Sequence, residues 1–422
     1  MRSTGEQGIA APDALTALFC DEALLSVFSA LQLEGEETRI VGGALRDALF
    51  GRPPHEIDLA TTLFPEAVIT RTKAAGLRAI PTGIQHGTVT VLAGQETFEV
   101  TTLREDIETD GRHAEVRFGR DFRIDALRRD FTMNALSLAP GGRLFDYTGG
   151  LADIVARKVR FIGEPEQRIK EDYLRILRFF RFSADFGEGL LDRAGRLAAI
   201  RQREGLGQLS RERIRAELLK LFCARKAVEV CSEICGDGLL HPLLASAPNP
   251  ARLRRLIAIG EGAGPAENPL LRLAALCLAL PEDALRLRDR LRLSNTEAER
   301  LEAAARALIG LHGRDEPPGF HDLQALLFRH GRQAAVDAVL LAEADARPGN
   351  GGGWVLARNF LFEATEPRLP FSGADVIALG ITEGRAIGEA LRGLQARWIE
   401  AGFPTDPASL TRLLDEVPRR AG

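Results

Sequence analysis

Strand-like patterning in this chain is confined to about the first 150 residues, and no other feature constrains the fold as much. Beyond about residue 151, leucine, alanine and arginine recur at helical spacing. Runs rich in β-branched residues, bounded by turn signals, predict strands at Arg39–Val41, Ile57–Ala60, Thr88–Leu92, Thr97–Thr102, Leu136–Leu138 and Leu144–Asp146. The pattern therefore predicts an α/β head followed by an all-α region.

A chain of 422 residues is too long for one hydrophobic core, so two to four domains are expected. Breaks rich in proline and glycine interrupt the helical region near residues 248–250, 316–319 and 348–353. From the change of pattern and these breaks we predict a head (1–150), a helical neck (151–225), a helical body (226–345) and a helical tail (346–422).

A glycine turn stands near the start of the head, where the sequence reads IVGGALRDALFGRPPHEIDLATT from Ile40. Gly42 and Gly43 let the backbone approach a phosphate closely, and the amides that open the next helix favour negative charge. Arg46 lies on that helix, which makes Gly43 and Arg46 candidate nucleotide-binding residues. Turns of this kind are common in proteins that bind no ligand there. The turn therefore indicates nucleotide binding only in combination with neighbouring charged residues.

Two acidic residues stand about ten residues after Arg46. Residues two apart in a strand share a face, so Glu56 and Asp58 are expected to project together. Paired carboxylates beside a phosphate cradle suit two Mg2+ ions in nucleotidyl transfer, which makes both residues candidate catalytic and metal-binding groups. On a later strand, Glu99 is either a third catalytic acid or a charge at the strand edge.

A basic segment, ALRRDFTMNA, runs from Ala126 to Ala135. One interpretation places Arg128 and Arg129 beside a triphosphate, with Asp130 and Asn134 orienting them or touching the ribose. A basic helix start with a salt bridge explains the same residues equally well.

The segment EPEQRIKEDYLRILRFFRF, from Glu164 to Phe182, predicts one helix with a polar row. At helical pitch, residues three apart remain neighbours, so the row comprises Asp172, Arg175, Arg178 and Arg181. Arginine binds phosphate through paired hydrogen bonds, and Arg178 and Arg181 are therefore candidates for holding a triphosphate. The common alternative is a charged surface helix.

In this order and at this spacing, the segments resemble the signatures of the class II polymerase-β-like nucleotidyltransferases, which include tRNA CCA-adding enzymes and bacterial poly(A) polymerases. The resemblance is dense over the head and neck, and it implies a polymerase-β-like head. It also implies that Arg129 contacts the incoming nucleotide. By the same resemblance, Asp172 and Arg175 read the Watson–Crick edge of C or A, because a carboxylate accepts from an amine and a guanidinium donates to a ring nitrogen or carbonyl.

Three further segments gain a role through this resemblance. Residues 104–120, polar and mixed in charge, correspond to a flexible loop that helps to switch the enzyme from C to A. The segment SRERIRAEL, from Ser210, corresponds to a helix that braces the base-reading helix. The glycines of the C-terminal segment open a helix where the family's tail contacts tRNA, although plain helix packing explains them equally well: Gly380, Gly384 and Gly388.

These observations predict template-independent addition of CCA to the 3′ end of tRNA from CTP and ATP, with two Mg2+ ions. The predicted partners are CTP, ATP and the 3′ end, acceptor stem and elbow of tRNA, without DNA or a membrane. A poly(A) polymerase of the same class is one alternative, although residues 80–91 look like the CCA-adding form. A catalytically inactive RNA-binding homologue is another, because Glu56 stands where the family usually has Asp.

Five cysteines without a CxxC pair or zinc-ligand spacing predict reduced thiols. A signal-peptide pattern and an apolar run of membrane length are not evident in the sequence. Together these features predict a cytoplasmic protein. The net charge of −4 describes the whole surface, so it does not exclude a basic RNA-binding face.

Overall fold

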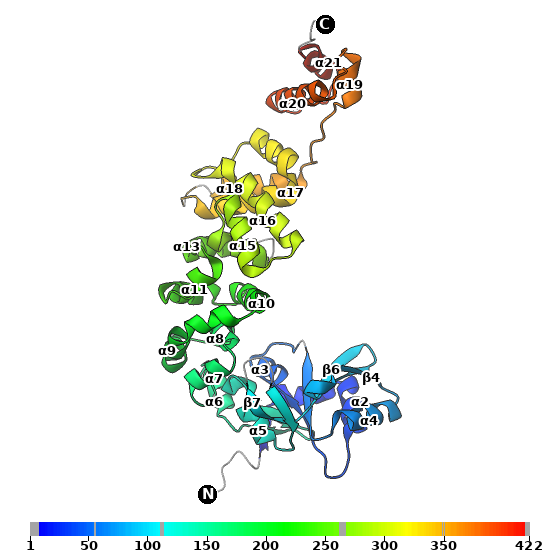
Figure 1. Ribbon diagram of the computed structural model, residues 1–422, viewed down its shortest axis with the longest axis vertical. Helices are drawn as coiled ribbons and strands as arrows, with labels where there is room; N and C mark the ends of the chain where they lie inside the picture. The colour runs from blue at the N-terminus through cyan, green and yellow to red at the C-terminus, as the bar shows by residue number, and fades with distance from the viewer. Residues whose placement is uncertain are drawn as a thin grey trace. The chain divides into compact units, whose positions relative to one another are not determined.

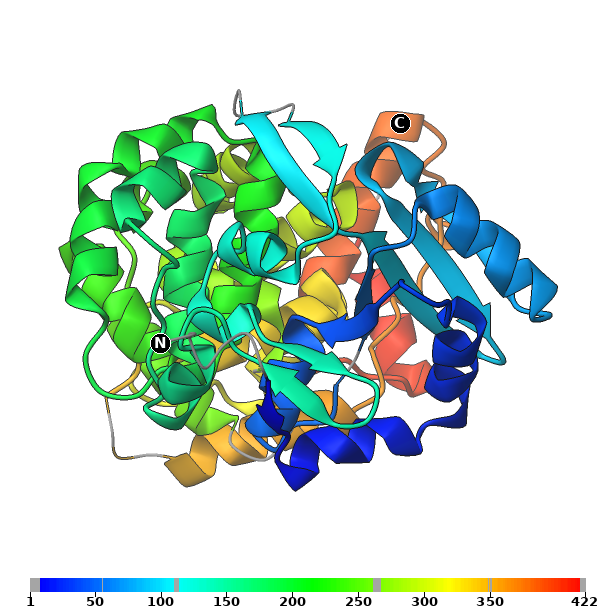
Figure 2. The same ribbon diagram turned by 90° about the horizontal axis from the view of Figure 1, so that it is seen from below.

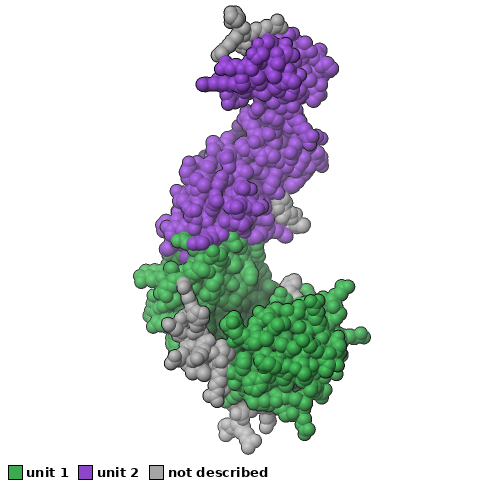
Figure 3. Space-filling view, turned by 45° about the vertical axis from the view of Figure 1, so that its right-hand side comes forward, with its two compact units in different colours: residues 1–239 green, residues 240–422 purple. Residues whose placement is uncertain are grey.

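The computed structural model describes residues 8–54, 56–109, 114–260, 267–347, 349 and 351–417. The chain forms two compact units, residues 1–239 and residues 240–422 (Figure 3). All the strands within the described residues lie in unit 1, and unit 2 is helical (Figure 1). The predicted fold class, an α/β head followed by helices, is confirmed. The finer division into four domains stays a prediction.

The head is built on a mixed sheet of eight strands in the order β1-β10-β9-β2-β3-β6-β5-β4. The pair β3 and β6 is parallel, and the other neighbours are antiparallel. The strands are β1 (Ile9–Ala10), β2 (Thr38–Val41), β3 (Ile57–Thr61), β4 (Arg78–Gly83), β5 (Thr88–Ala93), β6 (Glu96–Thr102), β9 (Ser137–Ala139) and β10 (Arg143–Phe145). All six predicted strands are present, and β9 and β10 are each displaced by one residue.

The head contains strands that were not predicted: the short edge strand β1, the edge strand β4 and the pair β7 and β8. The edge strand β4 contains Pro81 and is mostly accessible, so it lacks the alternation that marks a half-buried strand. Residues 104–120 are not a plain loop, because β7 (Arg104–Thr109) and β8 (Ala114–Phe118) pair antiparallel as a separate two-stranded sheet. This pair forms the cyan arrows of Figure 2.

Helices of the head flank the sheet and connect its strands: α1 (Asp13–Thr16), α2 (Glu22–Leu31), α3 (Gly43–Leu49), α4 (Pro65–Ala74) and α5 (Phe122–Leu127). α4 packs on β4 and β5 and also contacts α2. The inward residues of β5, Val89, Val91 and Ala93, alternate with more accessible ones, so the two-residue period of this strand matches its buried face.

The rest of unit 1 consists of α6 (Gly150–Val155), α7 (Pro165–Glu171), α8 (Leu174–Phe186), α9 (Arg193–Arg201), α10 (Arg211–Phe222) and α11 (Ala227–Gly236). The single helix predicted over 164–182 is wrong, because the chain breaks between α7 and α8 at Asp172. Asp172 is extended (φ −154°, ψ 107°), and its carboxylate accepts the amide of Leu174 at 3.0 Å. The aspartate thus ends α7, and its side chain binds the first amide of α8, which a helical-spacing argument does not foresee.

Unit 2 comprises α12 (Leu240–Leu244), α13 (Pro250–Ile259), α14 (Pro269–Cys277), α15 (Pro281–Leu291), α16 (Asn295–Leu308), α17 (Phe320–Asp345), α18 (Gly351–Glu363), α19 (Gly373–Ala378), α20 (Gly384–Glu400) and α21 (Pro407–Asp415). α17 is interrupted at Gly331, whose φ of 76° and ψ of 164° are not helical. Before this break, Ala325 and Phe328 pack in a cluster with Trp398 and other apolar residues of 369–417. After it, Asp337 binds Arg300 of α16, the carbonyl of Leu341 accepts from Arg252 of α13, and Glu343 binds Arg358 of α18.

The described cysteines are free thiols, as predicted. Among the described residues, no single helix is long and apolar enough to cross a membrane. One pair of helices, residues 13–20 and 22–31, reaches that threshold by length and composition, but it bends by 82°. Its apolar residues Leu15, Leu24, Val27 and Leu31 are buried in the head.

Candidate active site

The glycine turn connects β2 to α3, as predicted. Gly42 has a φ of +76°, which only glycine adopts without strain. A Cβ atom on Gly42 would also lie 3.0 Å from Nη1 of Arg129 and 3.9 Å from a carboxylate oxygen of Asp58. The turn therefore meets a basic group and an acidic group at the same point, and the small residue is what allows this approach.

Two acids stand next to each other on the parallel strands at the centre of the sheet. Asp58 of β3 is paired in register with Glu99 of β6. Burial raises the pKa of Asp58, and the charges of Glu99 and Glu56 raise it further, while Arg129 opposes them. The carboxylates of Asp58 and Glu99 repel each other when both are charged, and a cation bound between them would remove this repulsion.

Glu56 is less well placed than the sequence suggested. It precedes β3, is exposed, and does not line the cavity that holds Asp58 and Glu99. Its carboxylate is still close enough to contribute to the raised pKa of Asp58. Its role as a metal ligand stays a prediction.

The arginines of the RRD segment are held by Asp125, a carboxylate that was not predicted as a site residue. Asp125 is 4% exposed, and one of its oxygens accepts from Nε of Arg128 at 2.9 Å while the other accepts from Nε and Nη2 of Arg129 at 3.2 and 3.1 Å. Burial works to raise the pKa of Asp125, but Arg129 and Arg128 outweigh it and the pKa is lowered. The spacing of three and four residues on a helix was the available signal.

Asp130 is the centre of a second buried network. Its Oδ2 accepts from Nε and Nη2 of Arg178 at 2.8 and 2.6 Å, and its Oδ1 accepts from the side-chain amide of Asn134 at 2.9 Å. Asn134 in turn accepts from Arg46 at 2.7 Å. Burial favours a raised pKa for Asp130, yet Arg178 and the hydrogen bonds lower it. The network joins α3, the RRD segment and α8.

Arg181 is held in a similar way by Glu217 of α10, with Nε 2.6 Å from Oε2. The ring of Phe182 lies under three guanidinium groups, at 5.0 Å from Arg46, 5.2 Å from Arg178 and 4.3 Å from Arg181. Each arginine thus has an acid or amide partner and shares one aromatic ring, which fixes its direction.

The predicted base-reading residues lie apart from this cluster. Asp172 accepts from Arg213 of α10 at 2.7 Å, and Nη1 of Arg175 donates to Oε2 of Glu171 at 2.5 Å. Neither Asp172 nor Arg175 lines the cavity that holds Asp58 and Glu99. Ser210 caps α10 through the amide of Arg213 at 3.4 Å. The helix predicted to brace this segment contacts it through the bond from Arg213 to Asp172.

That cavity, of about 480 Å³, brings the remaining predicted residues together. Its lining includes Gly42, Gly43, Arg46, Asp58, Glu99, Arg128, Arg129, Asp130, Asn134, Arg178 and Arg181, and it also includes Asp125, Thr88, Thr101 and Phe182. The threonines could not be foreseen, because polar residues on a strand carry no signal of their own. The cavity is acidic on the sheet and basic along its helices, which suits a metal-bound polyphosphate.

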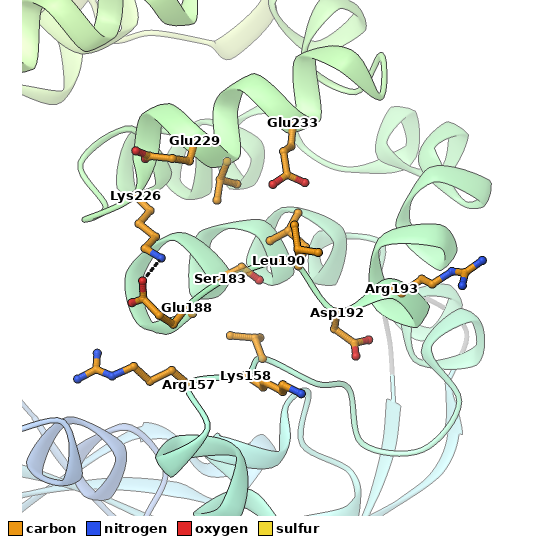
Figure 4. Close-up of a pocket in the computed structure, with 15 residues that line it drawn as sticks. Arg157, Lys158, Ser183, Glu188, Leu190, Asp192, Arg193, Lys226, Glu229 and Glu233 are labelled. Carbon is orange, nitrogen blue, oxygen red and sulfur yellow. Dashed lines mark hydrogen bonds and ion pairs between the residues drawn. The ribbon is translucent and has the colours of Figure 1, made fainter.

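A larger cavity of about 590 Å³ lies among the neck helices (Figure 4). The labelled acids Glu188 and Glu233 there are paired with Lys226 and Arg196, at 2.5 and 2.6 Å. None of the predicted site residues lines this cavity. We therefore assign the candidate active site to the cavity around Asp58.

The mixed sheet, the glycine turn and the acid pair define a nucleotidyltransferase head. Family models agree, because residues 38–160 match the poly A polymerase head domain and residues 196–250 match a probable RNA and SrmB-binding site of polymerase A.

Known proteins are similar over most of the chain. The mitochondrial CCA tRNA nucleotidyltransferase 1 of Mus musculus is 36% identical over 397 residues, covering 90% of this chain and 87% of its own length. The CCA-adding enzyme of Lactobacillus johnsonii is 28% identical over 394 residues, covering 93% and 96%. The crystal structure of the Bacillus stearothermophilus CCA-adding enzyme in complex with CTP superposes with a TM-score of 0.73 at 27% identity, covering 93% and 96%. The chain belongs to the class II tRNA nucleotidyltransferase family of CCA-adding enzymes and poly(A) polymerases.

Proposed function

We propose that this enzyme completes the 3′ end of tRNA by adding CCA from CTP and ATP without a nucleic-acid template. The observation that carries the proposal is the cavity in which Asp58 and Glu99 face Arg129, Arg178 and Arg181. Acids for a metal and arginines for a triphosphate thereby share one site. Relatives named as CCA-adding enzymes match along nearly the whole chain, which supports this choice of reaction.

The donor set fits Mg2+, which prefers one or two carboxylates together with phosphate oxygens and water. Asp58 and Glu99 are adjacent, and Glu56 approaches them from the end of β3. Among the described residues, no three His, Cys, Asp or Glu side chains form a ready-made metal site, so a bound triphosphate has to supply further ligands. Two bound Mg2+ ions would activate the attacking 3′ hydroxyl and neutralise charge on the leaving pyrophosphate.

The protein's own side chains orient the substrates. Arg129, Arg178 and Arg181 hold the triphosphate, and their acidic partners Asp125, Asp130 and Glu217 keep the guanidinium groups directed into the cavity. Such fixed donors lower the entropy cost of aligning the α-phosphate with the hydroxyl.

Selection of C and A falls to Asp172 and Arg175. Nη1 of Arg175 is occupied by Glu171 and by the carbonyl of Arg168, and within the described residues its Nε and Nη2 bond to no other group. Asp172 can exchange its bond to Arg213 for one to a base amine. A carboxylate acceptor with a guanidinium donor matches C and A, whereas G and U present a carbonyl where the amine is needed.

A transcript of tRNA that ends before CCA tests this function. With CTP alone we expect two added nucleotides, with CTP and ATP three, and with ATP alone none. A ladder of additions from ATP alone would instead identify a poly(A) polymerase, the alternative that the name of the head-domain family favours. No extension with any nucleotide, together with retained tRNA binding, would identify an inactive RNA-binding homologue.

The cellular location and the contacts to tRNA beyond its 3′ end belong to the same proposal. A cytoplasmic location stays a prediction, since the mouse relative is named as mitochondrial. Contact of residues 369–398 with the tRNA backbone also stays a prediction. There the α20 helix begins at Gly384, after a turn in which Gly380 has a φ of +89°.

A further inference from the structure

Arg168 of α7 joins two parts of the site that are separate in the sequence. Its Nη2 donates to the backbone carbonyls of Arg128 and Arg129, the latter at 2.5 Å. The carbonyl of Arg128 belongs to the C-cap of α5, where a helix leaves its last acceptors unsatisfied, and the carbonyl of Arg129 follows directly after it. The side chain of Arg168 is only 12% exposed, so the contact is largely shielded from water.

On its other side, Arg168 contacts the base-reading segment. Its Nη1 donates to Oε2 of Glu171, the same oxygen that accepts from Nη1 of Arg175 at 2.5 Å. Nη1 of Arg175 also donates to the backbone carbonyl of Arg168 at 2.8 Å. Arg168 and Arg175 are thereby fixed to each other through one carboxylate and one carbonyl.

We propose that Arg168 is a positioning residue that couples base reading to triphosphate binding. The inference rests on the proposed function of Asp172, Arg175 and Arg129. Arg168 does not line the cavity, so it acts through its neighbours and not on the substrate. It fixes the backbone from which Arg128 and Arg129 project, and it fixes the glutamate that directs Arg175. A nucleotide whose base displaces Arg175 therefore also disturbs the support of the phosphate-binding arginines.

The proposal predicts a combined defect. Arg168→Met keeps the apolar stem but removes every donor, so we expect KM for CTP and ATP to rise about tenfold and selectivity against UTP and GTP to fall about fivefold. Arg168→Lys keeps the positive charge and a single donor group, so its KM and its selectivity should lie between those of the wild type and Arg168→Met. Glu171→Gln removes the charge but keeps one acceptor oxygen, so it weakens the link on the Arg175 side only, and selectivity should fall modestly while KM changes less.

Arg71 provides a matched control. It donates to the carbonyls of Ala30 and Gln32 at the end of α2, at 3.0 and 2.5 Å, which is the same kind of helix-end contact at a site away from the cavity. We expect Arg71→Met to lower the thermal midpoint about as much as Arg168→Met while KM and selectivity stay at wild-type values. The double variant Arg168→Met/Arg175→Ala should be no less selective than Arg175→Ala alone, because Arg168 acts through Arg175.

The experiment measures kcat, KM and selectivity for the four nucleoside triphosphates on tRNA ending before CCA, and equilibrium binding of each triphosphate to the same proteins. Unchanged selectivity in Arg168→Met, or additive losses in the double variant, would overturn the coupling. Wild-type extension with C and A is the separate check on the proposed function. If the wild type failed to extend tRNA, the selectivity of triphosphate binding by the variants would still test the coupling. If Arg168→Met does not fold, Arg168→Lys and Glu171→Gln test it instead.

Discussion

Asp58 and Glu99 occupy paired positions on the parallel strands β3 and β6. Their side chains lie on the same side of the sheet at the point where the glycine turn leaves β2, and both line the candidate active site. Burial, together with the charge of Glu99, raises the pKa of Asp58. The two acids are therefore unfavourable to each other until a cation joins them, and this relationship underlies the first predictions.

Asp58→Ala should abolish incorporation of both C and A, because no other carboxylate among the described residues occupies its position beside the Gly42 turn. Loss of a metal ligand at the reacting phosphate is expected to cost at least about 100-fold in kcat. Incorporation of labelled CTP and ATP measures this loss, and tRNA binding by gel shift should persist. Substantial residual activity would refute the assignment of Asp58 to the metal.

Glu99→Gln should reduce kcat about 100-fold if Glu99 is the partner acid. Glu96 lies at the start of the same strand and, like Glu99, is exposed, but it does not line the cavity, so Glu96→Gln is the matched control and should leave activity unchanged. Wild-type turnover in Glu99→Gln would show that Glu99 has no catalytic role and is only a charge at the strand edge.

Glu56 should tolerate only another acid. We expect Glu56→Asp to remain active, with an altered preference between Mg2+ and Mn2+, because aspartate is one methylene shorter and shifts the ligand oxygen. Glu56→Gln should be severely impaired. Titration of activity with each metal measures both effects, and a fully active Glu56→Gln enzyme would show that this exposed residue is not a ligand.

Asp172→Ala and Arg175→Ala should lose selectivity for CTP and ATP over UTP and GTP. A well-placed pair of base contacts contributes roughly 1–3 kcal/mol of discrimination, or roughly 5- to 150-fold. Addition of single nucleotides to tRNA ending before CCA, with all four triphosphates, measures the ratios. If both variants incorporated the four nucleotides in wild-type ratios, Asp172 and Arg175 would not read the base and would only form ion pairs at the protein surface.

Asp125→Asn should separate phosphate binding from base reading. Asparagine offers one acceptor where the aspartate serves two arginines, so Arg128 and Arg129 lose part of their orientation. We expect KM for CTP and ATP to rise about tenfold with nucleotide ratios unchanged. A change in the ratios would show that Asp125 acts on base selection as well, and unchanged KM values would remove it from the site.

Much of this site could be predicted from the sequence because its parts are local. The Gly42 turn and the strand of Asp58 each depend on a short pattern, and the polar period around Arg178 predicted a helix there, although not where that helix begins. The partners of these residues are not local. Asp130 meets Arg178 and Arg181 meets Glu217 only because α8 lies between the head and α10, and no spacing in the sequence encodes that contact.

The errors have equally physical causes. Residues 104–120 lack the alternation of apolar residues that marks a buried strand, yet strands β7 and β8 satisfy each other's backbone hydrogen bonds. The single helix expected over 164–182 was inferred from a sustained polar period. The carboxylate of Asp172 competed for a backbone amide and ended the helix, an outcome that periodicity does not weigh.

The break in α17 at Gly331 has a consequence for how the C-terminal part of the chain is held. One helix has contacts on two sides of the break, since Ala325 and Phe328 pack with Trp398, while Asp337 and Leu341 after the glycine bind arginines of α16 and α13. The residues after Asp345 are thus a cover for a helix that precedes them. A truncation after Asp345 falls between helices, yet it would expose the apolar face of α17 that these residues cover. An exposed apolar face of this kind promotes aggregation.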